Sequence, residues 1–204
     1  MKDTKKMVQL AVLVAIIVIM AFTPLGFLMV GPVSITFMMI PVAVAAIIVG
    51  PAGGAIAGGV FGLSAFLRGF GLSPFATTLM GINPIYTFVL MIIPRVLAGW
   101  IPGIIYVSVC RVKNKTVAAM AASLAAPLCN TVLFVSALFL LFGNTDYIMG
   151  FGSTAWAIIV TLVGINGLVE AGVGFVTGAT ISRTLVHFFP GQNADIRIEK
   201  RGTA

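Results

Sequence analysis

Charged side chains are scarce in this sequence. Only 8% of its 204 residues are charged, whereas 60% are hydrophobic. A soluble domain carries about 25% charged residues, so this composition excludes a soluble domain. In a membrane, backbone polar groups must pair within the protein, which leaves either helices or a closed barrel. The apolar runs are long and continuous, rather than alternating over about ten residues, and they therefore indicate helices.

The residue types on which hydrolytic enzymes and metal sites depend are equally scarce. The chain has one histidine, His187, no HExxH motif, and five acidic residues with no close pair on one span. It contains no GxxxxGK[ST] motif, so it cannot supply its own phosphate-binding loop for ATP. Its two cysteines, Cys110 and Cys129, form no metal-like pair and are interpreted as free thiols. The sequence therefore predicts no catalytic residues, no metal site and no cofactor.

The length of the chain limits the number of spans. At about 20 residues per span, six spans take about 120 residues and leave only short loops. We therefore predict a single integral-membrane domain, an all-α compact bundle of six transmembrane helices. The predicted spans are residues 7–29, 34–50, 52–67, 83–109, 116–142 and 154–189, followed by a polar tail at 190–204. Glycine and proline punctuate the stretch from Arg68 to Ile82, which is predicted to be a loop.

Lysine and arginine orient the predicted bundle. The basic residues near span ends are Lys2, Lys5, Lys6, Arg111, Lys113, Lys115, Arg183, Arg197, Lys200 and Arg201. If the N-terminus is cytoplasmic, these ten of the 12 basic residues are cytoplasmic, as the positive-inside rule requires. Both termini are then cytoplasmic, Arg68 lies outside, and Arg95 lies within the membrane. The net charge of +7 thus reflects membrane topology, and no nucleic-acid partner is predicted.

Arg95 is a charge well inside an apolar segment, directly after Pro94. Such a charge costs at least about 2.5–3.5 kcal/mol on insertion scales, so it faces a partner or a wet cavity. At 1.5 Å per residue, Arg95 lies about 18 Å from the outer end of its span and Glu170 about 24 Å from the outer end of the sixth. Two interpretations remain open: a buried ion pair that fixes helix packing, or a substrate cavity in which Arg95 binds a carboxylate. The arginine fork suits a carboxylate better than a lysine would.

Amide side chains provide further candidates within the predicted spans. Asn130 lies on the fifth span, and Asn166 lies four residues before Glu170 on one face of the sixth. They are either interhelical hydrogen-bonding groups or contacts to a bound amide or hydroxyl. Asn83 and Tyr86 lie at the outer mouth of the fourth span, where capping and interface anchoring are the alternative to ligand contact.

The third span is rich in glycine. The pairs Gly54/Gly58 and Gly58/Gly62 are small-xxx-small motifs, which allow helices to approach closely. The first span carries a second small-residue pair, Ala11 and Ala15, in the sequence AVLVA.

Over about residues 7–187 the chain resembles the substrate-binding S component of energy-coupling-factor (ECF) vitamin transporters. The AxxxA of Ala11 and Ala15 looks like the motif through which S components dock on the shared transmembrane coupling subunit. More specific are TPLGF at 23–27, GPVSITFMMIPVAVAAIIVGPAGGAIAGGVFGLSAF at 31–66 and PRVLAG at 94–99. These stretches are similar to the pantothenate-type S component, with a folate-type relative second.

This resemblance implies an ATP-driven importer in the bacterial cell membrane. The partners would be a vitamin, the coupling subunit, two ATPases that hydrolyse the ATP, and membrane lipid. A vitamin site near the outer face would be built from the loops after spans one and three and from spans four to six. The S component is thought to tip in the membrane to release its vitamin. Small residues would then form its sliding face, namely Ala11, Ala15, Gly54, Gly58 and Gly62, although the glycines equally suit packing within the bundle.

Pantothenate has one carboxylate, one amide and two hydroxyls, and the sequence offers side chains for each group. The predicted substrate-binding residues are Arg95, Asn130, Asn166, Tyr86, Thr131, Asn83, Glu170 and Phe66. A folate or thiamin site would need stacked aromatic rings, which Phe66, Tyr86, Phe134 and Trp156 would supply. An unpaired Glu170 would favour a cationic ligand. The remaining alternative is a non-transporting structural membrane subunit, which would tolerate the joint loss of Arg95, Asn130 and Asn166.

Overall fold

The computed structural model describes residues 2–23, 26–30, 33–112 and 115–150, together with Gly172, Val176 and Thr180. In chain order the elements are α1 (Lys2–Phe22), β1 (Phe27–Val30), β2 (Val33–Thr36), α2 (Met39–Ile48), α3 (Pro51–Leu67), α4 (Pro74–Ile82), α5 (Pro84–Val112), α6 (Lys115–Phe142) and α7 (Asp146–Met149). Of the predicted sixth span, only those three single residues are described, all helical. The predicted tail at 190–204 lies outside the described residues.

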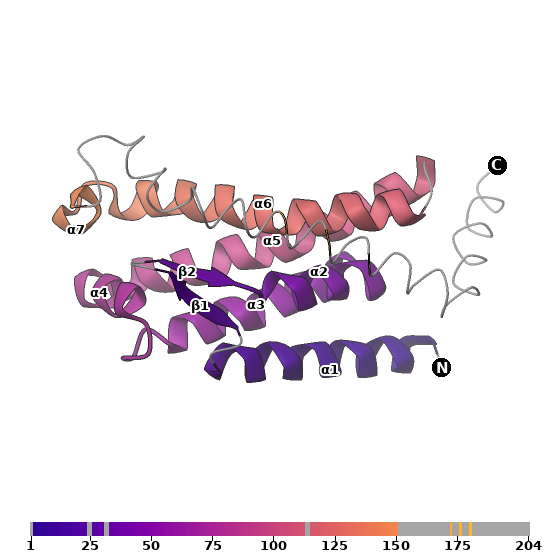
Figure 1. Cartoon of the computed structure of the whole chain (residues 1–204), viewed down its shortest axis with the longest axis horizontal. Helices are drawn as coiled ribbons and strands as arrows, with labels where there is room; N and C mark the ends of the chain where they lie inside the picture. The colour runs from indigo at the N-terminus through magenta and orange to yellow at the C-terminus, as the bar shows by residue number, and fades with distance from the viewer. Residues whose placement is uncertain are drawn as a thin grey trace.

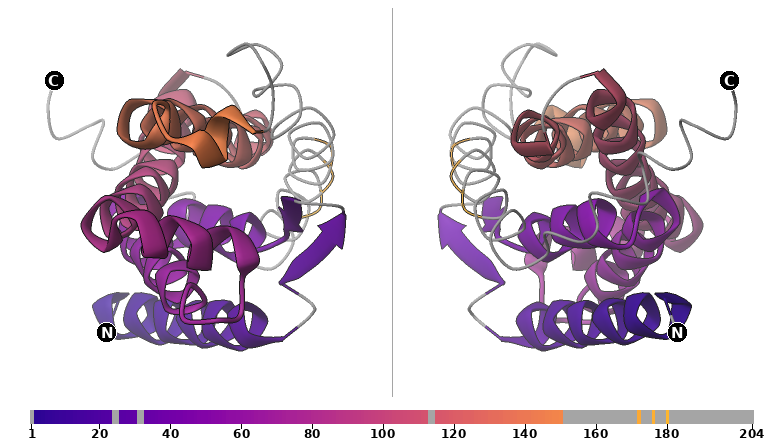
Figure 2. Two further views of the ribbon diagram at one scale, coloured as in Figure 1. Left: turned by 90° about the vertical axis from the view of Figure 1, so that its left-hand side faces the viewer. Right: turned by 90° about the vertical axis from the view of Figure 1, so that its right-hand side faces the viewer.

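The long helices run side by side along the longest axis of the molecule (Figure 1). α1 and α6 lie on opposite sides of a middle layer formed by α2, α3 and α5, and the end-on views in Figure 2 show the same order. α4 and α7 lie at one end of the bundle, and the N-terminus lies at the other. The apolar core between these layers includes Ile17, Val42, Phe61, Leu90 and Leu138, all at most 1% exposed.

Three described helices are long and apolar enough to cross a membrane: Thr4–Phe22, Pro84–Arg111 and Lys115–Phe142. α2 and α3 are apolar but shorter. These helices confirm the prediction of an apolar, helical membrane bundle. The number of six spans and the cytoplasmic placement of both termini stay predictions.

The first predicted span is corrected by the structure. α1 ends at Phe22 instead of residue 29, and a hairpin of β1 and β2 precedes α2, which begins at Met39 instead of residue 34. The strands are antiparallel, and Val30 pairs with Val33 across a two-residue connection. Gly26 permits the chain to leave α1 sharply, because a Cβ atom there would collide with the carbonyl of Met20. A continuous apolar run does not distinguish a short strand from a helix, which explains the error.

The predicted loop at 68–82 is also corrected, because it contains α4. Ser73 precedes α4 in an extended conformation, and Pro74 occupies the first helical turn, where its missing N–H costs no hydrogen bond. Ala76 and Leu79, three residues apart, bury one face of α4. The proline that indicated a loop therefore marks the start of a helix.

α3 and α5 pack with their backbones in contact. A Cβ atom at Gly54 would collide with the carbonyl of Gly99, one at Gly58 with that of Arg95, and one at Gly62 would lie 2.6 Å from that of Met91. Each step of four residues along α3 therefore matches four residues back along α5. The helices are antiparallel, and these contacts span about two helical turns.

This packing bears on the two roles considered for Gly54, Gly58 and Gly62. The glycines lie between α3 and α5, as expected for packing within the bundle. Their part in a sliding face stays a prediction.

Candidate functional site

Arg95 lies in the interior of α5, 11 residues after its first residue, which corresponds to about 16 Å along the helix. Its side chain is only 8% exposed. Pro94, the preceding residue, has no N–H and cannot bond to the carbonyl of Leu90 four residues earlier. Arg95 Nη1 donates a hydrogen bond to that carbonyl at 2.7 Å. The guanidinium therefore replaces the backbone donor that the proline removes.

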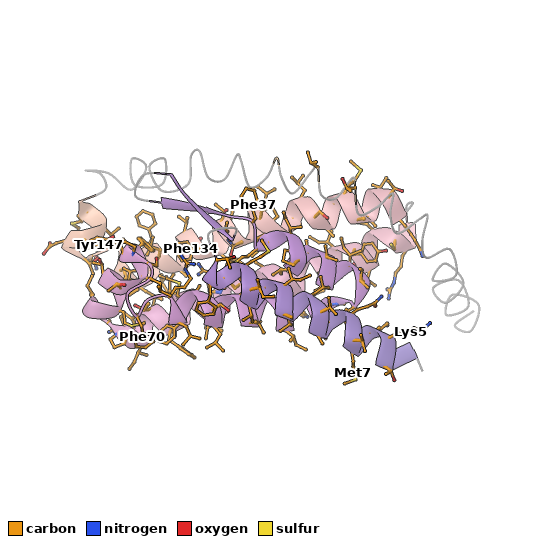
Figure 3. All side chains as sticks on the ribbon, turned by 60° about the horizontal axis from the view of Figure 1, so that its bottom comes forward. Lys5, Met7, Phe37, Phe70, Phe134 and Tyr147 are labelled. Carbon is orange, nitrogen blue, oxygen red and sulfur yellow. The ribbon has the colours of Figure 1, made fainter. Side chains whose placement is uncertain are left out.

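Two phenylalanine rings flank the guanidinium of Arg95. Its Cζ lies 4.3 Å from the ring centroid of Phe134 on α6 and 5.7 Å from that of Phe61 on α3. Both distances lie within the range of cation–π attraction. In Figure 3, Phe134 lies toward the end of the bundle that carries Phe70 and Tyr147, whereas Lys5 and Met7 lie at the opposite end. The charge thus lies where α3, α5 and α6 meet, displaced toward one end.

The pairing of α5 with α6 sets the level of Asn130 relative to Arg95. The ring of Tyr86 meets that of Phe142 edge-on at 6.1 Å, and Arg95 meets Phe134. Nine residues along α5 thus correspond to eight residues back along α6, so these helices are antiparallel. Asn130 lies four residues before Phe134 on the same face of α6 and therefore about one turn deeper, or about 5 Å.

Asn130 is buried, with 7% of its surface exposed. Its Oδ1 atom has no hydrogen-bond partner within the part of the chain that the structure describes. Buried polar atoms of native proteins are nearly always hydrogen-bonded, so such an acceptor needs an explanation. It is a buried acceptor about one helical turn along the bundle from the level of Arg95.

The other predicted residues on α5 and α3 lie closer to the end of the bundle. Asn83 caps α5, because its Oδ1 accepts hydrogen bonds from the backbone N–H groups of Ile85 at 3.0 Å and Tyr86 at 3.1 Å. Tyr86 is 45% exposed. Phe66 packs edge-on against Phe70 and Phe88, with centroids 5.9 and 5.2 Å away. Asn83 thus caps a helix and Phe66 packs against two rings, and ligand contacts of these residues stay a prediction.

Three of the remaining predictions concern residues that the structure does not describe. Asn166, Glu170 and Trp156 lie outside the described residues, so the pair of Arg95 with Glu170 stays a prediction. Thr131 is partly buried and directly follows Asn130 on α6.

An aromatic network continues from Phe134 toward the end of the bundle. Phe75 of α4 lies 6.3 Å from Phe134 and 6.2 Å from Tyr147 of α7, between ring centroids. Phe61, Phe75 and Tyr147 were missed as site residues in the sequence analysis. Aromatic residues are common in apolar spans, and α4 was predicted to be a loop, so no sequence pattern indicated this cluster.

Ser123 is a second buried polar group on α6 that the sequence analysis missed. It is 1% exposed, and its Oγ has no hydrogen-bond partner among the described residues. It lies seven residues before Asn130, hence on the same face and about two turns deeper. The only sequence hint is Pro127, four residues later, which cannot donate to the Ser123 carbonyl.

Arg68 has a structural role that solvation alone would not explain. Its Nη1 donates to the carbonyl of Ala21 in the last turn of α1. Burial lowers the pKa of Arg68 from its usual value. A cation at a helix C-terminus also interacts favourably with the helix dipole. Arg68 therefore ties the end of α3 to the end of α1.

Ala11 and Ala15 lie on the exposed side of α1. Large apolar side chains surround them, since Val8, Val12 and Ile19 are each more than half exposed. This surface is available to lipid or to another protein.

The chain matches the model of one protein family, described as the substrate-specific component of ECF transporters, over residues 5–181. No curated protein matches the chain.

Proposed function

Because the chain belongs to the family of ECF transporter substrate-specific components, we propose that it binds pantothenate with high affinity for import by an ATP-driven ECF complex. Members of this family are substrate-binding subunits of transporters rather than enzymes. The chain is accordingly an integral membrane protein, as its apolar helices indicate.

The observation that carries this proposal is the buried guanidinium of Arg95 between Phe61 and Phe134. A guanidinium presents N–H donors in a planar fork that matches a carboxylate, and the pairing is stronger in a low-dielectric interior. The two rings lie within cation–π range of the group and exclude water from it on their sides. An anionic group of a small ligand is therefore the chemistry that the site supports best.

Asn130 supplies the second half of the recognition. Its buried Oδ1 is an acceptor about one helical turn from the level of Arg95. A ligand with a carboxylate at one end and amide or hydroxyl donors a few bonds away would satisfy both groups. Pantothenate has this arrangement. Asn166, Thr131, Tyr86 and Glu170 are proposed to complete the contacts.

A second candidate ligand class is a vitamin with a flat ring, such as folate or thiamin. The ring of Phe75 lies between those of Phe134 and Tyr147, with centroids 6.3 and 6.2 Å away. Aromatic side chains at this spacing offer a stacking surface for a planar heterocycle.

We propose that the coupling subunit docks on the exposed apolar side of α1 that carries Ala11 and Ala15. Small side chains there allow a partner helix to approach closely. ATP hydrolysis would occur in two partner ATPases, and both termini of this chain would be cytoplasmic. The compartment is the bacterial cell membrane.

Isothermal titration calorimetry on the purified protein tests the proposed ligand, with pantothenate first and then folate, thiamin and riboflavin. Tight binding of pantothenate that is lost in Arg95→Ala is the expected result. Binding of another vitamin would keep the family role and discard the substrate. A folded protein that binds none of the four would contradict vitamin capture and favour a structural subunit.

A further inference from the structure

Prolines lie at three places inside α5 and α6, the two longest helices that the structure describes. Pro94 and Pro102 lie inside α5, and Pro127 lies inside α6. Each lacks an N–H, so the carbonyl four residues earlier loses its usual helical donor. In a membrane interior, water does not replace that donor. The affected carbonyls are those of Leu90, Ala98 and Ser123.

At Leu90 a side chain replaces the missing donor. Arg95 Nη1 lies 2.7 Å from the Leu90 carbonyl oxygen, and both residues are buried. Helical side chains lean toward the N-terminus of their helix, so an arginine directly after a proline can reach back to the carbonyl that the proline leaves bare. The adjacent Pro94 and Arg95 thus act as one unit, in which the proline creates the acceptor and the arginine occupies it.

We propose that Pro94 is a positioning residue, which holds the Arg95 guanidinium ready for the anionic group of the ligand. This inference depends on the proposed function, because it concerns the same binding site. The bond to Leu90 holds one terminal nitrogen of the guanidinium, and the rings of Phe61 and Phe134 lie 5.7 and 4.3 Å from its Cζ. A donor that is ordered before binding loses less conformational entropy when the ligand arrives.

A double-mutant cycle tests the Pro94–Arg95 unit without any ligand. The variants are Pro94→Ala, Arg95→Met and the two combined, and the measurement is the melting temperature in detergent. With Pro94 present, Arg95→Met leaves the Leu90 carbonyl without a donor. In the Pro94→Ala background, the backbone N–H of the new alanine supplies one. We therefore expect Arg95→Met to lower the melting temperature by at least about 2 °C more when Pro94 is present than in the Pro94→Ala background.

Pro102→Ala is the matched control, since Pro102 is also buried inside α5 and frees the carbonyl of Ala98. Arg95 bonds to Leu90, so the effects of Pro102→Ala and Arg95→Met on melting temperature should add. Equal coupling for the two prolines, or none for Pro94, would overturn the inference.

Ligand discrimination tests the positioning role itself. Panthenol is the neutral alcohol analogue of pantothenate, so the ratio of the two affinities measures recognition of the carboxylate. We expect Pro94→Ala to lower this ratio about tenfold and Pro102→Ala to leave it unchanged. A general structural role would weaken both ligands alike, and an unchanged ratio in Pro94→Ala would contradict positioning. If the unaltered protein binds no pantothenate, the proposed function fails, whereas the melting-temperature cycle still decides whether Pro94 holds Arg95.

Discussion

The two faces of α5 are built in opposite ways. Toward α3, the backbone of α5 touches glycines, with Gly58 against the carbonyl of Arg95. Toward α6, side chains fill the interface, where Arg95 meets Phe134 and Asn130 lies one turn deeper. At the glycine contacts of the first face no side chain separates the two backbones, so this face fixes the position of α5. The second face holds polar groups, and the proposed binding site lies there.

The difference follows from the size of the side chains. Small residues let helices approach until their backbones touch, and this contact tolerates little change. The α5–α6 interface combines aromatic rings with buried polar atoms, among them Ser123 Oγ and Asn130 Oδ1. Predicted effects on stability therefore concentrate on the glycine face, and predicted effects on binding concentrate on the α6 face.

The largest expected effect is on the glycine face. Gly58→Ala places a methyl group against the Arg95 carbonyl, and overpacking of this kind costs about 1–3 kcal/mol or more. Gly59→Ala is the matched control, because a Cβ atom there would lie 3.5 Å from Val96 Cγ2, an ordinary contact. We expect a large fall in the melting temperature for Gly58→Ala and none for Gly59→Ala. Equal melting temperatures would mean that α3 and α5 are not in backbone contact.

Removal of the buried charge should have the next largest effect. Hydrogen bonds to charged groups contribute about 1.5–3 kcal/mol, so Arg95→Ala should weaken pantothenate binding about 100-fold and abolish uptake. Arg111→Ala, in the exposed last turn of the same helix, is the control and should leave binding unchanged. Normal uptake by Arg95→Ala at normal expression would remove Arg95 from the site.

Asn130→Leu separates binding from packing at the second polar group. Its Oδ1 has no partner among the described residues, so an apolar replacement of similar size should leave the melting temperature unchanged or higher. Loss of the acceptor should weaken ligand binding about tenfold, for a bond of about 1.5 kcal/mol. Calorimetry and thermal unfolding of the same sample measure both quantities. A lower melting temperature with unchanged affinity would show that Asn130 is a packing residue.

The smallest effect is expected at Ser123, on the same face of α6 but about two turns deeper than Asn130. Ser123→Ala removes a buried hydroxyl that has no partner in the described part of the chain. The melting temperature should stay the same or rise slightly, and the affinity for pantothenate should not change. A loss of affinity would extend the binding site along α6 to this depth.

Some parts of the structure could be predicted from the sequence, and others could not. The helices α5 and α6 agree with the predicted spans to within a few residues, because long apolar runs leave few alternatives. Arg95 was predicted from the cost of burying its charge, and it is buried. The hairpin at β1 and β2 and the helix α4 were missed, because short apolar segments have no decisive period and proline marks both loops and helix starts.

Within the candidate site, only part of the geometry could be predicted. The sequence placed Arg95 and Asn130 on neighbouring spans at intermediate depth, and the register of α5 against α6 separates their levels by about one helical turn. The sequence did not show that Asn83 caps α5 or that Arg68 bonds to Ala21. Those contacts depend on how a side chain meets a backbone group, and for Arg68 that group is 47 residues away.

The sequence by itself determined that this chain is a helical membrane protein with a charge inside one of its apolar helices. These properties follow from local composition, because a bilayer interior accepts only apolar segments whose backbone groups pair within the helix. The tertiary structure alone decided which groups surround that charge: the glycine backbone of α3, the ring of Phe134 and the carbonyl of Leu90. These contacts depend on the register between helices and on the direction of each side chain, and neither is encoded in any single segment.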